Sequence, residues 1–308
     1  MPPVPRAHGR CAIILAGGEG TRLKSVTRRI SGQEIPKQFC RLIGAKTLLD
    51  QTRERVSRTI PAERTVTVVT RAHERFYEPL LDDMPADSIA VQPTGRGTAP
   101  AILYALMRLA QRAPDAVVTV FPSDHYLSDD SVFMRHVEIA SYAVDQRPEL
   151  SILLGMEPSR PEQSYGWIEP AEHLGIGEAA LFGVRSFVEK PDGPLARRLM
   201  SEGALWNSFV MTARVSTMIG LFMIAAPGLY VAFNSIRAAL GTAFEAKSVE
   251  RLYAQIPDVN FSHEVLEKCP VNLAVIPVRE VHWSDLGDPE RVQETWTRTG
   301  FTPEWASA

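Results

Sequence analysis

The chain has 308 residues, of which 45% are hydrophobic and 22% charged, and this composition excludes an intrinsically disordered protein. Its formal net charge is −3, whereas a protein that binds nucleic acid by counterion release is usually basic, so we expect no nucleic-acid partner. The 3 cysteines are odd in number and widely spaced, which disfavours a disulfide framework and is typical of the reducing cytoplasm. Residues 1–9 contain prolines but no apolar core, so we interpret them as a flexible tail rather than a signal peptide.

Strands and helices alternate in the first half of the chain. Apolar and β-branched runs predict strands at residues 11–16, 65–70, 88–92 and 116–121. Helical periodicity predicts helices at residues 47–56, 99–112 and 132–144. This alternation predicts a largely parallel sheet with helices on both faces. Because ligands of such sheets bind at the carboxyl ends of the strands, we expect the site near the glycines after residue 16 and near Asp124.

The pattern becomes less regular after residue 150. Short strand-like runs occur at residues 152–155, 166–168, 184–188 and 273–278, and helical patterns at residues 195–201 and 248–255. Residues 218–233 are the most apolar stretch, but Pro227 and Gly228 interrupt it and it is too short for a membrane span, so we predict a buried helix followed by a turn. No Ser/Gly-rich linker separates the halves, which favours one α/β unit with two lobes, the second a substrate lobe.

A glycine-rich loop follows the first predicted strand, in the sequence LAGGEGTRL (residues 15–23). Its three glycines would let backbone N–H groups approach an anion closely, and Arg22 could pair with a phosphate. Leu23 stands where the GxGxxG fingerprint needs its third glycine, and no GxxxxGK[ST] motif occurs, which disfavours an NAD-linked dehydrogenase and a P-loop protein. Taken alone, the loop is better explained as a tight turn with a surface arginine.

A second motif, PKQF at residues 36–39, follows the loop. Together the two motifs resemble the sugar-1-phosphate nucleotidylyltransferases, most closely the mannose-1-phosphate guanylyltransferases, in which a GGxGTRL loop and PKQF cradle the nucleoside triphosphate. Further segments match in the family's order: QPTGRGTAP (92–100), FPSDH (121–125), YGWI (165–168), FVEKP (187–191), LWNS (205–208) and WSDLG (283–287). The resemblance covers residues 10–295.

The resemblance implies a fold as well as a family. That fold is α/β, with a Rossmann-like mixed, mostly parallel sheet, helices on both faces and an inserted sugar-binding lobe. The catalytic domain would span residues 10–295, with a nucleotide lobe at about 10–150 and a sugar-binding lobe at about 151–290, before a C-terminal tail at 296–308. Family members with a C-terminal β-helix or isomerase domain are longer, so we expect a catalytic domain alone.

The resemblance also implies which residues bind the substrates. The residues expected to bind the nucleotide are Leu15, Ala16, Gly17, Gly18, Gly20, Thr21, Arg22, Lys37, Gln92, Gly97, Thr98 and Asp124. The residues expected to bind the sugar are Tyr165, Gly166, Glu189, Lys190 and Asn207. Arg22, Lys37 and Lys190 would be the catalytic cations, and Asp124 and Asp285 would hold Mg²⁺ as the cofactor.

The implied reaction joins GTP to α-D-mannose 1-phosphate and gives GDP-mannose and pyrophosphate. Nucleotidyl transfer depends mainly on positioning and on neutralising the leaving pyrophosphate. The attacking phosphate oxygen is already anionic, so the reaction requires no general base. We therefore expect GTP and mannose 1-phosphate as partners, no membrane partner, a cytoplasmic location and, as one oligomeric state to test, a homodimer.

Each site residue has a simpler explanation when it is considered alone. Asp124 could cap a helix or form an Asx turn, and Asp285 could lie in a turn. Lys37 and Lys190 could be solvated surface lysines. The occurrence of all the motifs in one order disfavours these explanations.

Departures from the family's pattern leave two alternatives open. Lys24-Ser25 stands where the family has WP, and residues 28–34 lengthen the connection to PKQF. Phe209 replaces an expected glycine and Ser262 an expected aspartate, both on the sugar side. The first alternative is a nucleotidyltransferase for another sugar 1-phosphate or nucleotide, and the second is a non-catalytic regulatory sibling that binds a nucleotide sugar.

Overall fold

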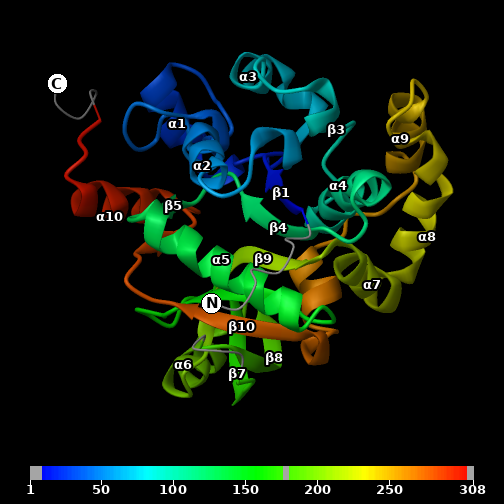
Figure 1. Ribbon diagram of the computed structural model, residues 1–308. Helices are drawn as coiled ribbons and strands as arrows, with labels where there is room; N and C mark the ends of the chain where they lie inside the picture. Colours follow the sequence, from blue (N-terminus) through cyan, green and yellow to red (C-terminus); the bar gives the residue numbers. More distant parts are fainter. Residues whose placement is uncertain (1–8, 176–179, 304–308) are drawn as a thin grey trace, which may run out of the picture.

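A nine-stranded mixed sheet forms the centre of the computed structural model, which describes residues 9–175 and 180–303 (Figure 1). The strands lie in the order β3-β2-β1-β4-β9-β6-β10-β8-β7. Their bounds are β1 Arg10–Leu15, β2 Thr65–Thr70, β3 Ile89–Gln92, β4 Val117–Pro122, β6 Ser151–Met156, β7 Gly166–His173, β8 Phe182–Glu189, β9 Leu205–Arg214 and β10 Leu273–Val278. A separate antiparallel pair consists of β5 (Tyr126–Leu127) and β11 (Trp283–Ser284).

The two sides of the sheet differ in strand direction. β1 pairs in parallel with β2 and β4, and β2 pairs in parallel with β3. β9 runs antiparallel to β4 and β6 and so joins this side to β6 and β10, which are again parallel to each other. β7 and β8 form an antiparallel pair at the far edge. The predicted mixed sheet is confirmed: the pairings of the nine strands are four parallel and five antiparallel, and the parallel ones predominate from β3 to β4.

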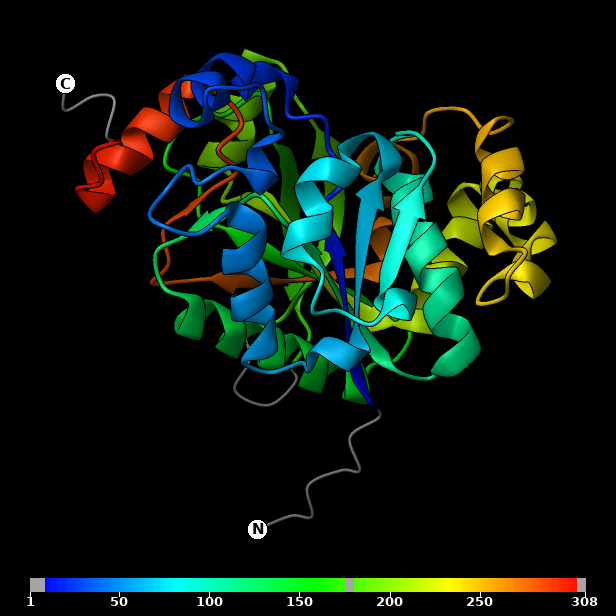
Figure 2. The same ribbon diagram turned by 90° about the horizontal axis from the view of Figure 1, so that it is seen from above.

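Helices cover both faces of the sheet, as the alternation in the sequence predicted (Figures 1 and 2). Their bounds are α1 Lys24–Ser31, α2 Leu48–Ser57, α3 Glu74–Tyr77, α4 Thr98–Arg112, α5 Asp130–Gln146, α6 Gly193–Ser201, α7 Val215–Ala225, α8 Pro227–Ser235, α9 Glu245–Tyr253 and α10 Pro289–Thr299. α4 contacts β1, β2 and β3 together with α7 and α8, whereas α5 contacts β4, β6, β9 and β10. β2, β4 and β6 are buried at every residue because both of their faces are covered.

Three parts of the fold correct the sequence-based predictions. Residues 24–31 form helix α1, where we expected only a lengthened connection. Strand β9 crosses the middle of the sheet, where we predicted no strand; the polar residues Asn207 and Ser208 interrupt the continuous apolar run that marks a strand buried on both faces. Residues 218–233 belong to two helices, α7 and α8, rather than to one helix and a turn.

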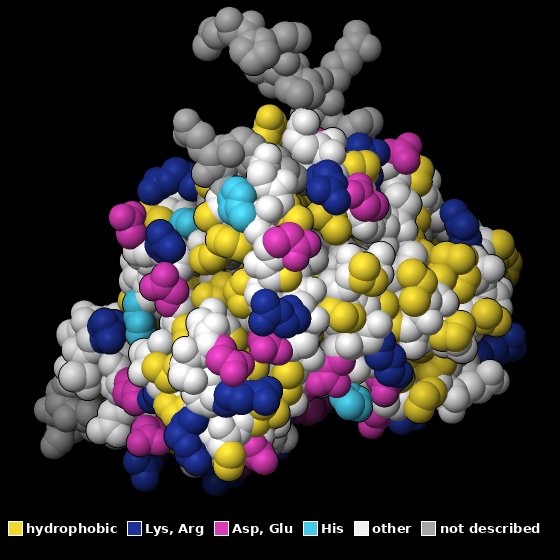
Figure 3. Space-filling model, turned by 90° about the horizontal axis from the view of Figure 1, so that it is seen from below, with side chains coloured by type: hydrophobic (Ala, Val, Ile, Leu, Met, Phe, Trp, Pro, Cys, Tyr) yellow, Lys and Arg dark blue, Asp and Glu magenta, His cyan; other side chains and the backbone are white. Residues whose placement is uncertain are grey.

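The α7–α8 region is also less buried than we predicted. Met223 and Ile224 are 51% and 65% exposed. Figure 3 shows hydrophobic side chains gathered toward the right, the side on which α7 and α8 lie in Figure 1. Among the described residues, no helix is both long enough and apolar enough to cross a membrane.

The C-terminal helix packs back against the N-terminal part of the chain (Figure 2). α10 continues beyond residue 295, where we expected the tail to begin, and the Trp296 indole donates a hydrogen bond to the Leu42 carbonyl at 2.7 Å. Most of the predicted N-terminal tail and the end of the predicted C-terminal tail, residues 1–8 and 304–308, lie outside the described residues. The division into two lobes near residue 150 stays a prediction.

Candidate active site

The glycine loop (residues 17–23) leaves β1 at the carboxyl edge of the parallel strands. Gly17 lies so close to the ends of β2 and β3 that a Cβ there would come within 2.9 Å of Thr70 Oγ1 and 2.7 Å of Gln92 Nε2. The Thr70 hydroxyl donates a hydrogen bond to the Gly17 carbonyl at 3.0 Å. Because only glycine allows this approach, the loop backbone is fixed against the ends of the neighbouring strands.

A buried glutamine supports the loop from behind. Gln38 Nε2 donates hydrogen bonds to the carbonyls of Ala16 and Gly18, at 3.1 and 2.7 Å. Ala16 is fully buried and its N–H donates to the Val68 carbonyl, so it lies behind the loop instead of facing a pocket. Sequence reasoning gave Gln38 no role, although its place in the PKQF motif could have indicated one.

A pocket of about 590 Å³ lies in front of the loop, at the carboxyl ends of β1, β3 and β4. The predicted nucleotide-binding residues that line it are Leu15, Gly17, Gly18, Gln92, Gly97, Thr98 and Asp124. A second hollow, of about 290 Å³, shares Glu19 and Asp124 with the first. The predicted residues that line only this hollow are Gly20, Thr21, Arg22 and Lys37. The structure therefore gathers the predicted nucleotide set at one edge of the sheet, with Ala16 behind it.

The far wall of the pocket is joined to a later segment of the chain. Gly97 has a φ of +80°, and a Cβ there would lie 2.3 Å from the Val259 carbonyl oxygen. The Ala99 N–H donates a hydrogen bond to the same oxygen at 3.0 Å. The Phe261 N–H donates to Thr98 Oγ1 at 2.8 Å, so this predicted nucleotide residue uses its hydroxyl within the protein.

Two aspartates that are far apart in the sequence meet at one lysine. The pairing of β5 with β11 brings their segments together. Lys37 Nζ lies 3.2 Å from Asp124 Oδ2. The same ammonium group donates hydrogen bonds to the backbone carbonyls of Asp285 and, at 3.3 Å, of Leu286. The two residues predicted to hold a metal thus lie on either side of a predicted catalytic cation.

One oxygen of the Asp285 carboxylate is firmly anchored. Oδ1 accepts hydrogen bonds from the Tyr165 hydroxyl at 3.0 Å, the Gly287 N–H at 2.9 Å and Arg291 Nη1 at 2.7 Å. Burial raises the pKa of Asp285, but the charges of Lys37 and Arg291 outweigh burial and hold the pKa below its ordinary value. No hydrogen bond to Oδ2 occurs among the described residues, so this oxygen remains available to a cation.

His125 is a neutral neighbour of this centre. The Trp283 indole N–H donates to its Nδ1 at 3.1 Å, so the ring proton is on Nε2, which lies 3.7 Å from Asp124 Oδ1. Burial lowers the pKa of His125 to about 4. In the described part of the chain no three His, Cys, Asp or Glu side chains gather as a metal cluster. A cation here would therefore depend on the two aspartates and on oxygens of the substrate.

Four of the five predicted sugar-binding residues, Tyr165, Gly166, Glu189 and Lys190, lie where β7 begins and β8 ends. A Cβ on Gly166 would come within 2.7 Å of the Phe187 ring and 2.9 Å of Glu189 Oε2. Burial raises the pKa of the Glu189 carboxyl. Lys190 has a φ of +50°, and its N–H donates to the Tyr165 carbonyl at 3.1 Å. Its side chain is 58% exposed, lies 3.5 Å from Glu189 and lines neither of the two pockets at the glycine loop.

Asn207, the remaining predicted sugar-binding residue, lies on β9 two residues before Phe209. Asn207 is buried, and its Oδ1 accepts a hydrogen bond from the Phe209 N–H at 3.1 Å. Phe209 lines the larger pocket, has a φ of +62° and packs edge-on against Phe261. The residue that replaces the family's glycine thus keeps a backbone conformation that favours glycine and adds a ring to the pocket wall.

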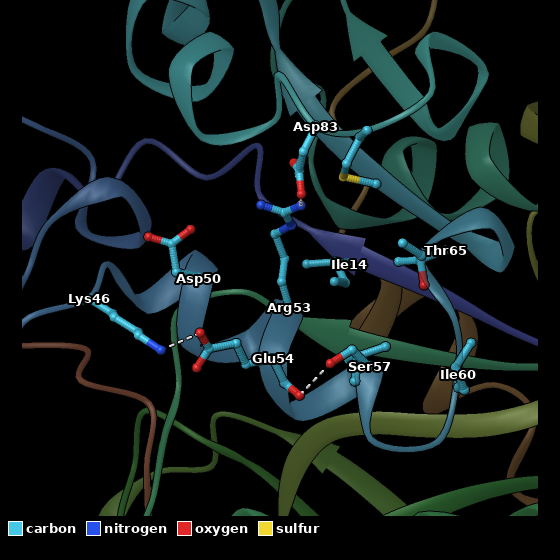
Figure 4. Close-up of a pocket in the computed structure, with 12 residues that line it drawn as sticks. Ile14, Lys46, Asp50, Arg53, Glu54, Ser57, Ile60, Thr65 and Asp83 are labelled. Carbon is cyan, nitrogen blue, oxygen red and sulfur yellow. Dashed lines mark hydrogen bonds and ion pairs between the residues drawn. The ribbon is translucent and has the colours of Figure 1, made fainter.

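A separate hollow of about 410 Å³ lies beside α2 and the start of β2 and contains none of the predicted site residues (Figure 4). Four of its charged groups pair with one another: Arg53 with Asp83 at 2.6 Å, and Lys46 with Glu54. Because these charges already have partners within the protein, they offer little to recognise a charged ligand, and we assign the hollow no role.

The glycine loop, Lys37 and the two predicted metal aspartates thus lie together at one edge of the sheet of an α/β fold. The family model described as "Nucleotidyl transferase" matches residues 11–297. The chain belongs to this family.

Individual relatives and solved structures also match most of this chain. The chain is 31% identical over 280 residues to the alginate biosynthesis protein AlgA of Pseudomonas fluorescens, covering 89% of this chain and 56% of that protein. It is 26% identical over 292 residues to a mannose-1-phosphate guanylyltransferase of Escherichia coli, covering 94% and 60%. Among solved structures, one named a mannose-1-phosphate geranyltransferase, from Thermus thermophilus, matches with a TM-score of 0.78 and 30% identity, covering 90% and 76%. The chain spans a little over half the length of these curated relatives.

Proposed function

We propose that the chain transfers the guanylyl group of GTP to α-D-mannose 1-phosphate, giving GDP-mannose and pyrophosphate. One observation carries the proposal: Lys37 lines the hollow that contains Arg22 and also contacts both aspartate segments. A hollow lined by the cations of Arg22 and Lys37 together with the carboxylates of Glu19 and Asp124 is suited to a triphosphate that binds with a divalent cation. The name of the guanylyltransferase relative supports the choice of base and sugar.

The two adjoining pockets would bind different parts of the nucleotide. The larger pocket would receive the base and ribose, because its walls combine apolar side chains with the polar Gln92 and Thr98. The smaller hollow would receive the phosphates, where Arg22 and Lys37 supply positive charge and the glycine loop lines the wall. This arrangement would orient the α-phosphorus toward the sugar side and stabilise the leaving pyrophosphate.

Asp124 and Asp285 would hold Mg²⁺. Their oxygens suit this hard cation, which takes few protein ligands and completes its coordination with water and phosphate. The anchored orientation of Asp285, with Oδ1 saturated and Oδ2 without a partner among the described residues, fits this assignment. When bound, Mg²⁺ would neutralise charge on the reacting phosphates.

The sugar phosphate would bind on the opposite side of the centre. Glu189 would accept hydrogen bonds from sugar hydroxyls, and the Asn207 amide would accept or donate them. Tyr165 would form a wall of the sugar site beside them. Lys190, whose ammonium group is exposed, would turn to the incoming phosphate. That phosphate is its own nucleophile, so these residues need only place it in line with the α-phosphorus.

The test is pyrophosphate release from GTP and mannose 1-phosphate, with and without Mg²⁺. We expect release that requires both substrates and the metal. Absence of release with this pair would overturn the proposal. A panel of other sugar 1-phosphates with ATP, UTP and dTTP would then separate a different substrate from the non-catalytic sibling, which would be silent with every pair.

A second candidate keeps the reaction and changes the sugar or nucleotide. The observation in its favour is Phe209, whose ring occupies the pocket wall at the position of the family's glycine. This candidate is supported if another pair in the panel has a higher kcat/KM than GTP with mannose 1-phosphate. The homodimer and the cytoplasmic location stay predictions, which sedimentation of the purified chain and cell fractionation can test.

A further inference from the structure

Arg291, on the first turn of α10, is a buried arginine that the sequence analysis did not single out. Its side chain is 5% exposed. The guanidinium lies 2.7 Å from Asp285 Oδ1, 3.0 Å from Glu162 Oε1 and 3.2 Å from Asp288 Oδ2. Its Cζ also lies 4.4 Å from the centre of the Tyr165 ring. The Arg291 guanidinium therefore connects Asp285, in the loop before α10, with Glu162 and Tyr165, in the segment before β7.

These contacts restrict the Asp285 carboxylate. Arg291 is one of three donors to Oδ1, the others being the Tyr165 hydroxyl and the Gly287 N–H. A Cβ on Gly287 would lie 2.5 Å from Asp285 Oδ2 and 2.8 Å from Arg291 Nη1, so only glycine leaves room for the arrangement. The carboxylate cannot rotate without losing several hydrogen bonds at once, and Oδ2 keeps one direction.

We propose that Arg291 is a positioning residue: it fixes the direction of Asp285 Oδ2 and the plane of the Tyr165 ring with a single guanidinium. The inference rests on the proposed function, because it assigns Asp285 to the cation and Tyr165 to the sugar. Groups that orient a metal ligand commonly change metal affinity or activity by about 10–100-fold when they are removed. Arg291 would act through these two residues and touch neither substrate.

The alternative is that Arg291 only stabilises the fold, as a buried ion pair. Arg108 offers a matched control on α4. Its side chain is 7% exposed, its Nε lies 3.4 Å from Glu245, and its Cζ lies 6.0 Å from the centre of the Tyr104 ring. It also donates hydrogen bonds to two backbone carbonyls, and it lines neither nucleotide pocket. Arg108 thus shares with Arg291 its burial, a carboxylate partner and a neighbouring tyrosine ring, but it lies away from Asp124 and Asp285.

The experiment compares R291K and R108K in the full chain. Lysine keeps the charge but cannot hold two partners in one plane. Binding of Mn²⁺ is measured by electron paramagnetic resonance in the presence of a GTP analogue with a methylene group between the α- and β-phosphorus. We expect R291K to weaken Mn²⁺ binding at least about tenfold and R108K to leave it within about twofold. Equal effects of the two variants, or unchanged binding in R291K, would overturn the inference.

A milder variant covers the case in which R291K does not fold. E162Q weakens one contact of Arg291 on the side away from Asp285, and we expect about threefold weaker Mn²⁺ binding. Unchanged binding in folded E162Q would then count against the positioning role. The metal-binding readout separates the two proposals: a wild-type chain that releases no pyrophosphate, yet needs Arg291 to bind Mn²⁺ tightly, overturns the proposed function and leaves this inference standing.

Discussion

The glycine-loop side of the candidate site and the aspartate side are built in different ways. The glycine loop is held mainly through its backbone, which receives hydrogen bonds from Gln38 and Thr70 and, at Gly17, lies too close to its neighbours for a side chain. Asp285 is held mainly through side chains, with Tyr165 and Arg291 as two of its three donors. Substitutions in the glycine loop should therefore act through steric fit, and substitutions around Asp285 through the charge and the orientation of its carboxylate.

The largest effect should come from D285N, on the side-chain side. Tyr165, Gly287 and Arg291 all donate to Oδ1, so the asparagine will keep its oxygen there and turn its NH₂ group to the position of Oδ2. An NH₂ group cannot ligate a cation, and we expect kcat/KM to fall at least about 100-fold. The measurement is pyrophosphate release as a function of Mg²⁺ concentration.

D288N is the control for D285N. Asp288 caps α10 by accepting the Arg291 N–H at 3.0 Å, and asparagine caps a helix equally well. Because Asp288 also contacts the Arg291 guanidinium at 3.2 Å, we expect D288N to change the Mg²⁺ dependence by at most about threefold, as E162Q would, and far less than D285N. If D285N retained the turnover and Mg²⁺ dependence of the wild type, Asp285 would not be a metal ligand.

On the backbone side, two glycines should respond to alanine in opposite ways. A Cβ on Gly97 would meet the Val259 carbonyl at 2.3 Å in a left-handed conformation, so G97A should lower the free energy of unfolding by about 3 kcal/mol. A Cβ on Gly18 meets no atom within 4 Å, although Gly18 lines the pocket. G18A should leave stability within about 0.5 kcal/mol and weaken nucleotide binding about tenfold.

Urea unfolding and equilibrium binding of GTP to the two variants separate these effects. The opposite result would contradict both assignments: G18A would lower the free energy of unfolding, and G97A would weaken GTP binding without lowering it.

Phe209 allows a test at the boundary between the two sides. Glycine adopts a φ of +62° without strain, so F209G should keep the backbone and open the pocket wall. We expect discrimination between mannose 1-phosphate and bulkier sugar 1-phosphates to fall about tenfold in kcat/KM. F209A is the control, because it opens the same space while keeping the left-handed strain, and it should be about 1 kcal/mol less stable than F209G. Unchanged discrimination in both variants would remove Phe209 from substrate selection.

The same contrast explains which features the sequence could predict. The parallel strands β1, β2 and β4 and the glycine loop depend on local patterns, and the structure contains them within a residue or two of the predicted bounds. β9 was missed because Asn207 and Ser208 interrupt the continuous apolar run by which buried strands such as β2 and β4 are recognised.

The aspartate side was predictable only in part. The motif resemblance named Asp124 and Asp285, but nothing local in the sequence shows that they meet at Lys37. Arg291 was missed because its partners lie on segments brought together only by the fold. The positive φ of Phe209 was likewise invisible, although the replacement of an expected glycine indicated where to look.

The smallest effect should come from E189Q, which separates stability from binding on the side-chain side. Burial raises the pKa of Glu189, so as the pH rises above the ordinary glutamate range the unfolded chain loses its proton first and the folded state loses stability. Glutamine carries no charge, so E189Q should be at least as stable as the wild type at pH 7 and lose less stability between pH 4 and 7.

The KM of E189Q for the sugar phosphate should rise about fivefold, because a charged acceptor of hydrogen bonds from sugar hydroxyls becomes neutral. Urea unfolding across this pH range and steady-state kinetics measure the two quantities, with the exposed E172Q on the neighbouring strand β7 as the control for a lost surface charge. A variant that lost stability at pH 7 and kept its KM would make Glu189 a structural residue and move sugar recognition elsewhere.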